Sequence, residues 1–348
     1  MLGHVSQMSM VKPTPHEPDA GLDRRRPTIA VLVPCYNEAA TIETVVHDFH
    51  RSLPDADVYV YDNNSSDGTA SVAAAAGAIV RREPLQGKGN VVRRMFADID
   101  ADIYVMVDGD ATYDAASAPK MIDRMLAEHL DMVTGVRRGE EKAAFRRGHR
   151  FGNWMFSTLI TVIFGDRVGD LLSGYRVFSR RFVKSFPALS GAFEIETELT
   201  VHALELRMPL GDVDTPYGAR PEGSVSKLST VKDGIRILST VLELVKNERP
   251  LPLFGGLGAA MMLLALILGL PLVLTFLETG LVPRVPTAII VVGLSTIGIG
   301  SLFTGIVMDS VTRGRQELKR LSYLAHGPVA PGRTLDAVDA PQAGRSAP

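Results

Sequence analysis

Two aspartates separated by a single glycine, Asp108 and Asp110, are the most recognisable candidates for chemistry in this sequence. They follow residues 103–107 (IYVMV), an apolar run with the composition of a buried strand. Carboxylate oxygens are the ligands that Mg²⁺ and Mn²⁺ prefer, and an ion held in this way can bind a diphosphate. An isolated Asp-Gly-Asp is more often a simple turn, so the interpretation as a metal site depends on what lies beside it.

Three other polar clusters also follow short β-branched runs. They are residues 34–38 (PCYNE), 62–68 (DNNSSDG) and 86–89 (QGKG). The carboxyl ends of the strands form the ligand crevice of an open parallel sheet, so we expect all four clusters to meet at one edge. Asp62 is placed to accept hydrogen bonds from a uracil or a ribose, whereas Asp67 and Gly68 have the pattern of a turn and a helix cap.

The elements that must position these clusters are visible as an alternation along the chain. Strands are predicted at residues 28–33, 58–61, 78–81 and 103–107, and helical patterns lie between them. This alternation predicts an α/β fold with a mostly parallel, doubly wound sheet.

Two charge-free runs near the C-terminus are long enough to cross a bilayer. They cover residues 251–277 and 285–308, which are 27 and 24 residues long, and a spanning helix needs about 20. Two buried core helices are the alternative, but they rarely need charge-free runs of this length. Only residues 278–284 separate the runs, so we expect a transmembrane hairpin over 251–308.

The basic residues around this hairpin predict its orientation. Those outside it are Lys232, Arg236, Lys246, Arg249, Arg313, Arg315, Lys319 and Arg320, whereas the connecting loop has only Arg284. The positive-inside rule therefore predicts an integral membrane protein whose main domain and both termini are cytosolic. Residues 228–250 have an amphipathic pattern expected of a helix in the membrane interface, and residues 309–326 suggest a second, cytosolic juxtamembrane helix.

Composition limits the remaining possibilities. The chain has 348 residues, of which 46% are hydrophobic and 22% charged, and its net charge is −2. These values are typical of a folded protein. Nucleic acid is not an expected partner, because the chain has no strong excess of positive charge. The single cysteine, Cys35, excludes an internal disulfide framework. Residues 1–27 and 327–348 are expected to be disordered tails, and the first has no apolar run of the kind a secretory signal needs.

Taken in order, the segments 34–38 (PCYNE), 61–69 (YDNNSSDGT), 87–90 (GKGN) and 108–110 (DGD) resemble family 2 glycosyltransferases with the GT-A fold. The segments 170–181 (DLLSGYRVFSRR), 193–199 (FEIETEL) and 220–228 (RPEGSVSKL), followed by the hairpin, are similar to the branch that acts on polyprenyl phosphates. This branch includes dolichyl-phosphate mannose synthases and bacterial lipid-linked glucosyltransferases. The resemblance implies a catalytic domain over residues 28–227.

The resemblance also implies roles for individual residues. A nucleotide-sugar donor would be bound by the following residues: Pro34, Tyr36, Asn37, Glu38, Asp62, Lys88 and Arg137. The metal, Mg²⁺ or Mn²⁺, would lie on Asp108 and Asp110, with Asp108 also near the ribose. A flexible phosphate-binding loop would contain Arg220, Ser226 and Lys227, and the segment with Arg146, Arg150 and Asn153 would receive the acceptor phosphate. Mannose synthases often continue with Leu-Gln after this motif, whereas this chain has Ala111 and Thr112.

That departure leaves the third metal ligand open between Thr112, Asp114 and water, and it favours glucose from UDP-glucose over mannose from GDP-mannose. Asp170 precedes the segment 173–176 (SGYR) and is a candidate to orient the sugar or an arginine. Glu196 and Glu198 are also candidates to orient the sugar or an arginine. Alternatively, they only flank a helix.

Direct displacement at the anomeric carbon implies inversion, and the acceptor would be a polyprenyl phosphate. One alternative is transfer to another lipid or to a growing glycan, as in a processive polysaccharide synthase. Two spans cannot easily enclose the channel that such an enzyme needs, and its Gln-x-x-Arg-Trp signature is absent, because Trp154 is the only tryptophan. A non-catalytic membrane scaffold is the second alternative. Small residues at Gly293, Gly298 and Gly300 are compatible with close helix packing in a homo-oligomer.

Overall fold

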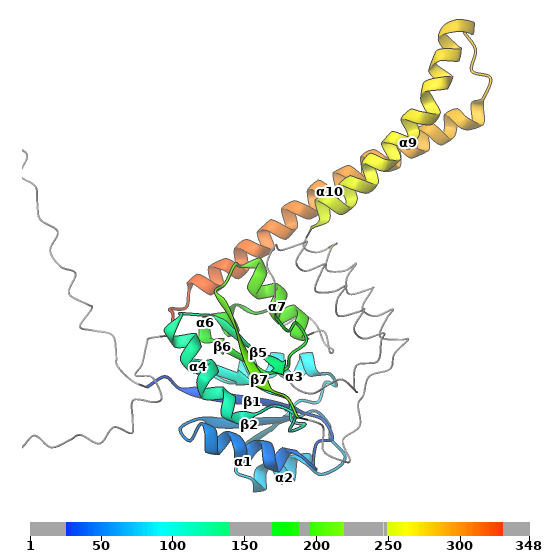
Figure 1. The fold of residues 1–348 in the computed structure, drawn as a ribbon. Helices are drawn as coiled ribbons and strands as arrows, with labels where there is room; N and C mark the ends of the chain where they lie inside the picture. Colours follow the sequence, from blue (N-terminus) through cyan, green and yellow to red (C-terminus); the bar gives the residue numbers. More distant parts are fainter. Residues whose placement is uncertain (1–25, 139–168, 188–194, 219–245, 247–248, 330–348) are drawn as a thin grey trace, which may run out of the picture.

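The structure is a computed structural model and describes residues 26–138, 169–187, 195–218, 246 and 249–329. Figure 1 shows an α/β domain from which two long helices extend. The strands are β1 (Ile29–Cys35), β2 (Asp57–Asp62), β3 (Ile79–Arg82), β4 (Ile103–Met106), β5 (Met132–Arg138), β6 (Arg176–Ser179) and β7 (Leu210–Pro216). The helices are α1 (Ile42–Ser52), α2 (Thr69–Ala75), α3 (Lys88–Asp98), η1 (Ala115–Ser117), α4 (Ala118–Ala127), α6 (Arg180–Ser185), α7 (Ile195–Glu205), α9 (Pro250–Thr279) and α10 (Val285–Leu324).

The seven strands form one sheet in the order β3-β2-β1-β4-β6-β5-β7. All pairings are parallel except those of β6, which runs antiparallel to both β4 and β5. Since β6 opposes both neighbours, β5 and β7 point in the same direction as β4. The carboxyl ends of six strands therefore lie at one edge, and the chain enters β6 at that same edge.

Both faces of the sheet are covered, which explains why the central strands β1 and β4 consist almost entirely of apolar residues. In β1, Val31 and Val33 pack against α1, α2 and α4, whereas Ala30 and Leu32 pack against α3, α6 and α7. The fully buried side chain of Phe96 from α3 belongs to the second layer, where it contacts other aromatic rings. The predicted α/β fold with a mostly parallel sheet is confirmed, and the four predicted strands correspond to β1 to β4.

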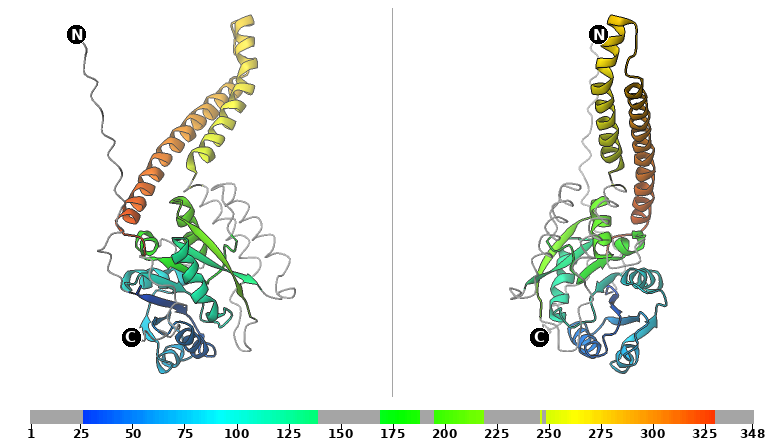
Figure 2. Two further views of the ribbon diagram at one scale, coloured as in Figure 1. Left: turned by 60° about the vertical axis from the view of Figure 1, so that its left-hand side comes forward. Right: turned by 90° about the vertical axis from the view of Figure 1, so that its right-hand side faces the viewer.

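Helices α9 and α10 lie side by side and project away from the α/β domain (Figure 2). Both are long and apolar enough to cross a membrane, and only 6% and 11% of their most apolar 18-residue windows are buried. The two helices pack closely at Gly258, where a Cβ atom would lie 2.7 Å from the carbonyl oxygen of Gly298. Gly298 therefore contributes to the contact inside the hairpin, whereas no atom of the described residues lies within 4 Å of a Cβ added at Gly293 or Gly300.

Helix α10 continues without interruption from the apolar run into the segment where a separate juxtamembrane helix was expected. Its last turns contact the α/β domain. The Tyr323 hydroxyl donates to Asp131 Oδ2 at 2.8 Å, and the Arg181 guanidinium binds the same carboxylate and lies 4.9 Å from the Tyr323 ring. Ser322 donates to the carbonyl of Lys184 at 3.1 Å. The expected amphipathic helix at 228–250 falls almost entirely outside the described residues.

Candidate active site

The Asp-Gly-Asp motif lies directly after β4, at the edge where the carboxyl ends of the strands meet. A Cβ atom on Gly109 would come within 2.7 Å of Cys35 Sγ, so only glycine lets this turn approach β1. Thr41 Oγ1 donates to the Gly109 carbonyl at 2.6 Å and fixes the turn from the side of α1. Asp110 is 5% exposed, and its Oδ1 accepts a hydrogen bond from the Thr112 hydroxyl at 2.6 Å. The motif is thus a rigid turn that holds two carboxylates at the end of β4.

Lys88 joins the motif to helix α7. Its ammonium group is bonded to the carboxylates of both Asp108 and Glu196, and all three side chains are largely buried. Burial opposes the charge on Lys88, but the two carboxylates outweigh it and raise the pKa of Lys88 above its ordinary value. Lys88 therefore remains a cation at any physiological pH. Gly87, at φ 130°, allows the chain to turn into α3 at this point and receives support from Asn63, whose Oδ1 accepts from its N–H at 2.7 Å.

Gly174 packs against the carboxylate of Asp108 from the opposite side. An added Cβ atom would lie 2.3 Å from Oδ2 and 2.7 Å from Cγ of Asp108. The N–H of Gly174 donates to the Tyr113 hydroxyl at 2.9 Å, and burial raises the pKa of Tyr113, which keeps this hydroxyl protonated. The loop before β6 therefore forms one wall of the site around Asp108.

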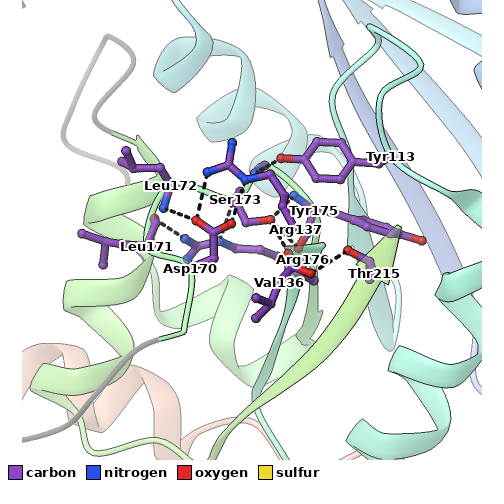
Figure 3. Close-up of polar contacts among 12 residues, drawn as sticks. Tyr113, Val136, Arg137, Asp170, Leu171, Leu172, Ser173, Tyr175, Arg176 and Thr215 are labelled. Atoms are coloured by element: carbon purple, nitrogen blue, oxygen red, sulfur yellow. Dashed lines mark hydrogen bonds and ion pairs between the residues drawn. The ribbon is translucent and has the colours of Figure 1, made fainter. Parts of the chain in front are cut away.

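A bidentate ion pair between Arg137 and Asp170 forms the next part of the site (Figure 3). Arg137 Nε donates to Asp170 Oδ2 at 2.7 Å and Nη2 donates to Oδ1 at 3.0 Å. Burial disfavours the charge on Arg137, but Asp170 more than compensates and raises its pKa. The guanidinium also lies 5.5 Å from the centre of the Tyr217 ring. Two hydrogen bonds and a ring contact thus fix the plane of this guanidinium at the carboxyl end of β5.

Arg176 is fully buried beneath the same loop, and three of its contacts are to neutral oxygen atoms. It donates to the carbonyls of Ser173 at 3.0 Å and Leu171 at 2.7 Å, and to the Thr200 hydroxyl at 2.8 Å. Burial lowers the pKa of Arg176 below its ordinary value. The residue ties the 171–173 loop to helix α7 through Thr200, and Figure 3 shows its contact with Leu171 on the loop side.

The loops after β1 and β2 are joined by side-chain to backbone hydrogen bonds. Asn37 has a positive φ of 53°, its N–H donates to Ser65 Oγ at 2.9 Å, and its Oδ1 accepts from the N–H of Ser66 at 2.8 Å. Asp62 is 6% exposed and its carboxylate accepts from the N–H of Ser65 at 3.2 Å. Asp67 accepts from the N–H of Thr69, the first residue of α2, and from the N–H of Ala39 in the loop before α1, while Gly68 is the N-cap residue of α2.

The carboxylates of Asp108 and Asp110 have the donor chemistry that a divalent cation requires. Within the described residues no group of three acidic, histidine or cysteine side chains forms a more complete ligand set. The Asp114 carboxylate caps η1 by accepting from the N–H of Ala116 at 3.2 Å and from the Ser117 hydroxyl at 2.8 Å. Since the Thr112 hydroxyl is bonded to Asp110, both protein candidates for a third ligand have other partners in this structure.

The structure brings together most of the residues singled out in the sequence. The segments with Asn37, Asp62, Lys88, Asp108 and Arg137 all lie at the same sheet edge. Pro34 is half-buried within β1, Tyr36 is exposed in the turn that follows, and Glu38 donates its N–H to Thr69 Oγ1. The predicted phosphate-binding and acceptor residues lie outside the described residues. These are Arg146, Arg150, Asn153, Arg220, Ser226 and Lys227.

Three contributors to the site were not identified from the sequence. Gly174 and Arg176 belong to a segment that the family resemblance quoted, but neither was assigned a role. Tyr113 follows the Asp-Gly-Asp motif closely and forms a bridge with Tyr217. For Glu196 the sequence left two roles open, either orienting the sugar or an arginine or only flanking a helix. Its contact with Lys88 places it in the site.

The sequence profile described as "Glycosyl transferase family 2" matches residues 30–186. Glycosyltransferase AglJ of Haloferax volcanii is 34% identical over 299 residues, which cover 85% of this chain and 98% of AglJ. An uncharacterized protein of Shigella flexneri is 54% identical over 155 residues, or 44% of this chain and 95% of that protein. A dolichyl-phosphate hexose transferase of H. volcanii is 26% identical over 221 residues, covering 64% of this chain and 95% of the transferase.

Among solved structures, glucosyl-3-phosphoglycerate synthase from Mycobacterium tuberculosis, in complex with Mn²⁺, UDP and phosphoglyceric acid, has a similar fold. The TM-score is 0.53 at 23% identity, and the match covers 63% of this chain and 78% of the synthase. This similarity establishes the fold of the α/β domain. The extensive match to AglJ, together with the profile match over residues 30–186, shows that the chain belongs to glycosyltransferase family 2.

Proposed function

We propose that this glycosyltransferase transfers a hexose from a nucleoside-diphosphate sugar to a polyprenyl phosphate at the cytosolic face of a membrane. The observation that carries the proposal is the arrangement around Asp108. Its carboxylate, a buried lysine and a fixed arginine meet at the sheet edge of a chain that also has two exposed apolar helices. The dolichyl-phosphate hexose transferase of H. volcanii supports a hexose and a lipid phosphate as substrates.

The donor is proposed to be UDP-glucose, bound with Mg²⁺ or Mn²⁺. Asp108 and Asp110 would hold the ion, which when bound offsets the negative charge of the diphosphate as the nucleotide leaves. The synthase with a similar fold binds Mn²⁺ and UDP, which supports this donor class. Asn37, Glu38 and Asp62 are proposed to contact the nucleoside, because the turn after β1 and the end of β2 lie side by side.

An acceptor phosphate monoester needs no strong general base. Its second pKa is about 6, so the nucleophilic oxygen is already mostly ionised in the cytosol. The protein must instead hold two anions that repel each other in line for displacement. Arg137 suits this task because Asp170 fixes its guanidinium plane while its charge persists at every physiological pH. Direct displacement on an α-linked donor gives a β-linked product.

The cations outside the described residues are proposed to complete the two phosphate sites. Arg220, Ser226 and Lys227 would close over the donor diphosphate, and the acceptor phosphate would bind the segment with Arg146, Arg150 and Asn153. The described structure supports the first assignment by position, since the backbone of Gly218 is hydrogen-bonded to Thr112 beside the Asp-Gly-Asp motif.

The proposal is tested with the detergent-purified chain, Mn²⁺, undecaprenyl phosphate and a panel of radiolabelled UDP- and GDP-sugars. Label is expected in the organic phase with one donor, and Asp110→Asn is expected to abolish it. Asp57→Asn is the matched control, because Asp57 is an exposed aspartate at the opposite end of β2. Labelled water-soluble polymer without labelled lipid would refute the polyprenyl acceptor and leave the donor site standing.

Stereochemistry is checked on the isolated product. The anomeric coupling constant of the lipid-linked sugar is expected to report a β-linkage when the donor is UDP-α-glucose. An α-linked product would contradict single displacement.

A further inference from the structure

Helix α7 makes polar contacts with three separate parts of the molecule. Glu196 in its first turn contacts Lys88, Thr200 in its middle contacts Arg176, and Glu205 in its last turn contacts Lys319 of α10. The first two contacts lead into the candidate active site. The third leads to the helix that extends into the apolar hairpin.

The contact at the end of α7 is a buried ion pair. Lys319 Nζ lies 2.5 Å from Glu205 Oε2, and the two side chains are 13% and 0% exposed. The other carboxylate oxygen of Glu205, Oε1, has no hydrogen-bond partner in the described part of the protein. Lys319 is also the only cation paired with Glu205 among the described residues. The charge of Glu205 is therefore offset by one group, and that group belongs to α10.

The contacts at the start and middle of α7 hold two walls of the site. Glu196 shares the Lys88 ammonium with Asp108. The Thr200 hydroxyl accepts from Arg176, which in turn holds the carbonyls of Leu171 and Ser173. Thr200 also donates to the carbonyl of Glu196 at 3.0 Å, so both contacts belong to one continuous turn of helix. A shift of α7 would move both walls together.

An α-helix transmits such a shift because it is rigid over short lengths. Glu205 lies nine positions after Glu196, which is about 14 Å along a helix axis. A buried carboxylate that loses its counter-charge is strongly unfavourable, so the structure around it must rearrange to hydrate it. Loss of Lys319 would therefore be felt first at the C-terminal turn of α7 and then at its N-terminal turn.

We propose that Lys319 and Glu205 are positioning residues, whose ion pair sets α7 against α10 and thereby sets Lys88 and the 171–173 loop in the donor site. The apolar hairpin and the site are then coupled through one helix. The coupling concerns the geometry of the described residues. Its consequence for catalysis rests on the function proposed above.

The test uses the full chain in detergent without ligand. Amide hydrogen exchange is compared between wild type and Lys319→Met in residues 88–92 and 170–174, with α1 on the other face of the sheet as the internal reference. Exchange in both segments is expected to rise at least fivefold, while exchange in α1 stays unchanged. Arg313→Met is the matched control, since Arg313 is a cation of α10 whose partner, Asp309, belongs to the same helix.

A second readout is Mn²⁺-dependent binding of UDP, for which Lys319→Met is expected to raise Kd at least fivefold and Arg313→Met less than twofold. A purely structural role would lower the thermal midpoint of unfolding and leave the Kd of the folded protein unchanged. If wild type itself does not bind UDP, the donor proposal fails, and hydrogen exchange still decides whether the ion pair positions α7.

Should Lys319→Met fail to fold, the double variant Glu205→Gln/Lys319→Met removes both charges and leaves no buried carboxylate unpaired. The same increases in exchange are expected, because the contact between α7 and α10 is lost there too. Wild-type exchange at residues 88–92 and 170–174 in either folded variant would overturn the proposal.

Discussion

Gly174→Ala tests whether the loop before β6 controls the position of the Asp108 carboxylate. The added methyl group would lie 2.3 Å from Oδ2, 2.7 Å from Cγ and 3.0 Å from Oδ1 of Asp108. Gly174 is not among the glycines with positive φ, so alanine is compatible with its backbone conformation. The perturbation is therefore steric and directed at one side chain.

The size of the effect follows from the overlap. Real contacts between a methyl carbon and an oxygen require about 3.3 Å, so the carboxylate and the loop must separate by about 1 Å. A displacement of about 1 Å at a reacting centre can cost about 100-fold in rate, or about 2.7 kcal/mol of transition-state stabilisation. We expect kcat/KM for sugar transfer to fall by about this factor.

The assay measures initial rates of lipid glycosylation over a range of Mn²⁺ and donor concentrations, with thermal unfolding as a check of folding. Gly218→Ala is the matched control, since Gly218 adjoins the same site and, among the described residues, an added Cβ would meet only the Thr112 carbonyl at 3.8 Å. A Gly174→Ala enzyme that folds and retains rates within threefold of wild type would refute the steric argument.

Three further predictions concern charged groups. Arg137→Lys is expected to lower kcat/KM by about 10- to 100-fold, because lysine cannot form the bidentate contact with Asp170. The control in the same rate assay is Arg138→Lys, because Arg138 forms an exposed ion pair with Asp214. Arg176→Met is expected to lower the free energy of unfolding by about 3 kcal/mol, measured by denaturant titration, because buried acceptors lose their donor. Burial, assisted by Lys319, lowers the pKa of His202 to about 3. The unfolded state therefore binds an extra proton below pH about 6.5, and stability is expected to fall by about 1.4 kcal/mol per pH unit from there towards pH 3. His202→Leu should remove this dependence in denaturant titrations at pH 7 and 5.5.

The first half of the sheet was predictable because its pattern is local. Strands β1, β2 and β4 are short, largely apolar runs followed by polar turns, and most of their residues are buried, whereas β3 is a mostly exposed edge strand. The rule that ligands bind at the carboxyl ends of such strands then indicated one edge for Asp62, Lys88 and Asp108. The structure has these residues at that edge.

The second half of the sheet was harder to predict from the sequence, because strands β5 to β7 do not follow one another in the sheet in chain order. Strand β6 inserts between β4 and β5 and runs antiparallel to both. Nothing in the residues of a four-residue strand specifies that placement. This insertion places the 170–174 loop against Asp108 and buries Arg176. The roles of the loop and of Arg176 therefore depend on the long-range pairing of β6 with β4 and β5.

The C-terminal helices show a different limit of prediction from the sequence. Their apolar composition predicted two long helices, and the structure has α9 and α10 at these places. That composition did not indicate that α10 would continue as one helix to the α/β domain, because Lys319 was considered only among the basic residues that predict orientation and Tyr323 was not singled out. Their contacts with Glu205 and Asp131 depend on the tertiary fold.

The cations of the site are held by carboxylates, and this arrangement bears on how the site accepts anions. Lys88 is paired with Asp108 and Glu196, and Arg137 with Asp170. A buried cation without a partner would be costly, so these carboxylates make it possible to keep positive charge at the site before substrate arrives. They also fix where the charge lies, which spares the reorganisation that a solvated lysine or arginine would undergo during transfer. A transferase that works on two phosphorylated substrates gains from such fixed charges, because its main task is to bring two anions together.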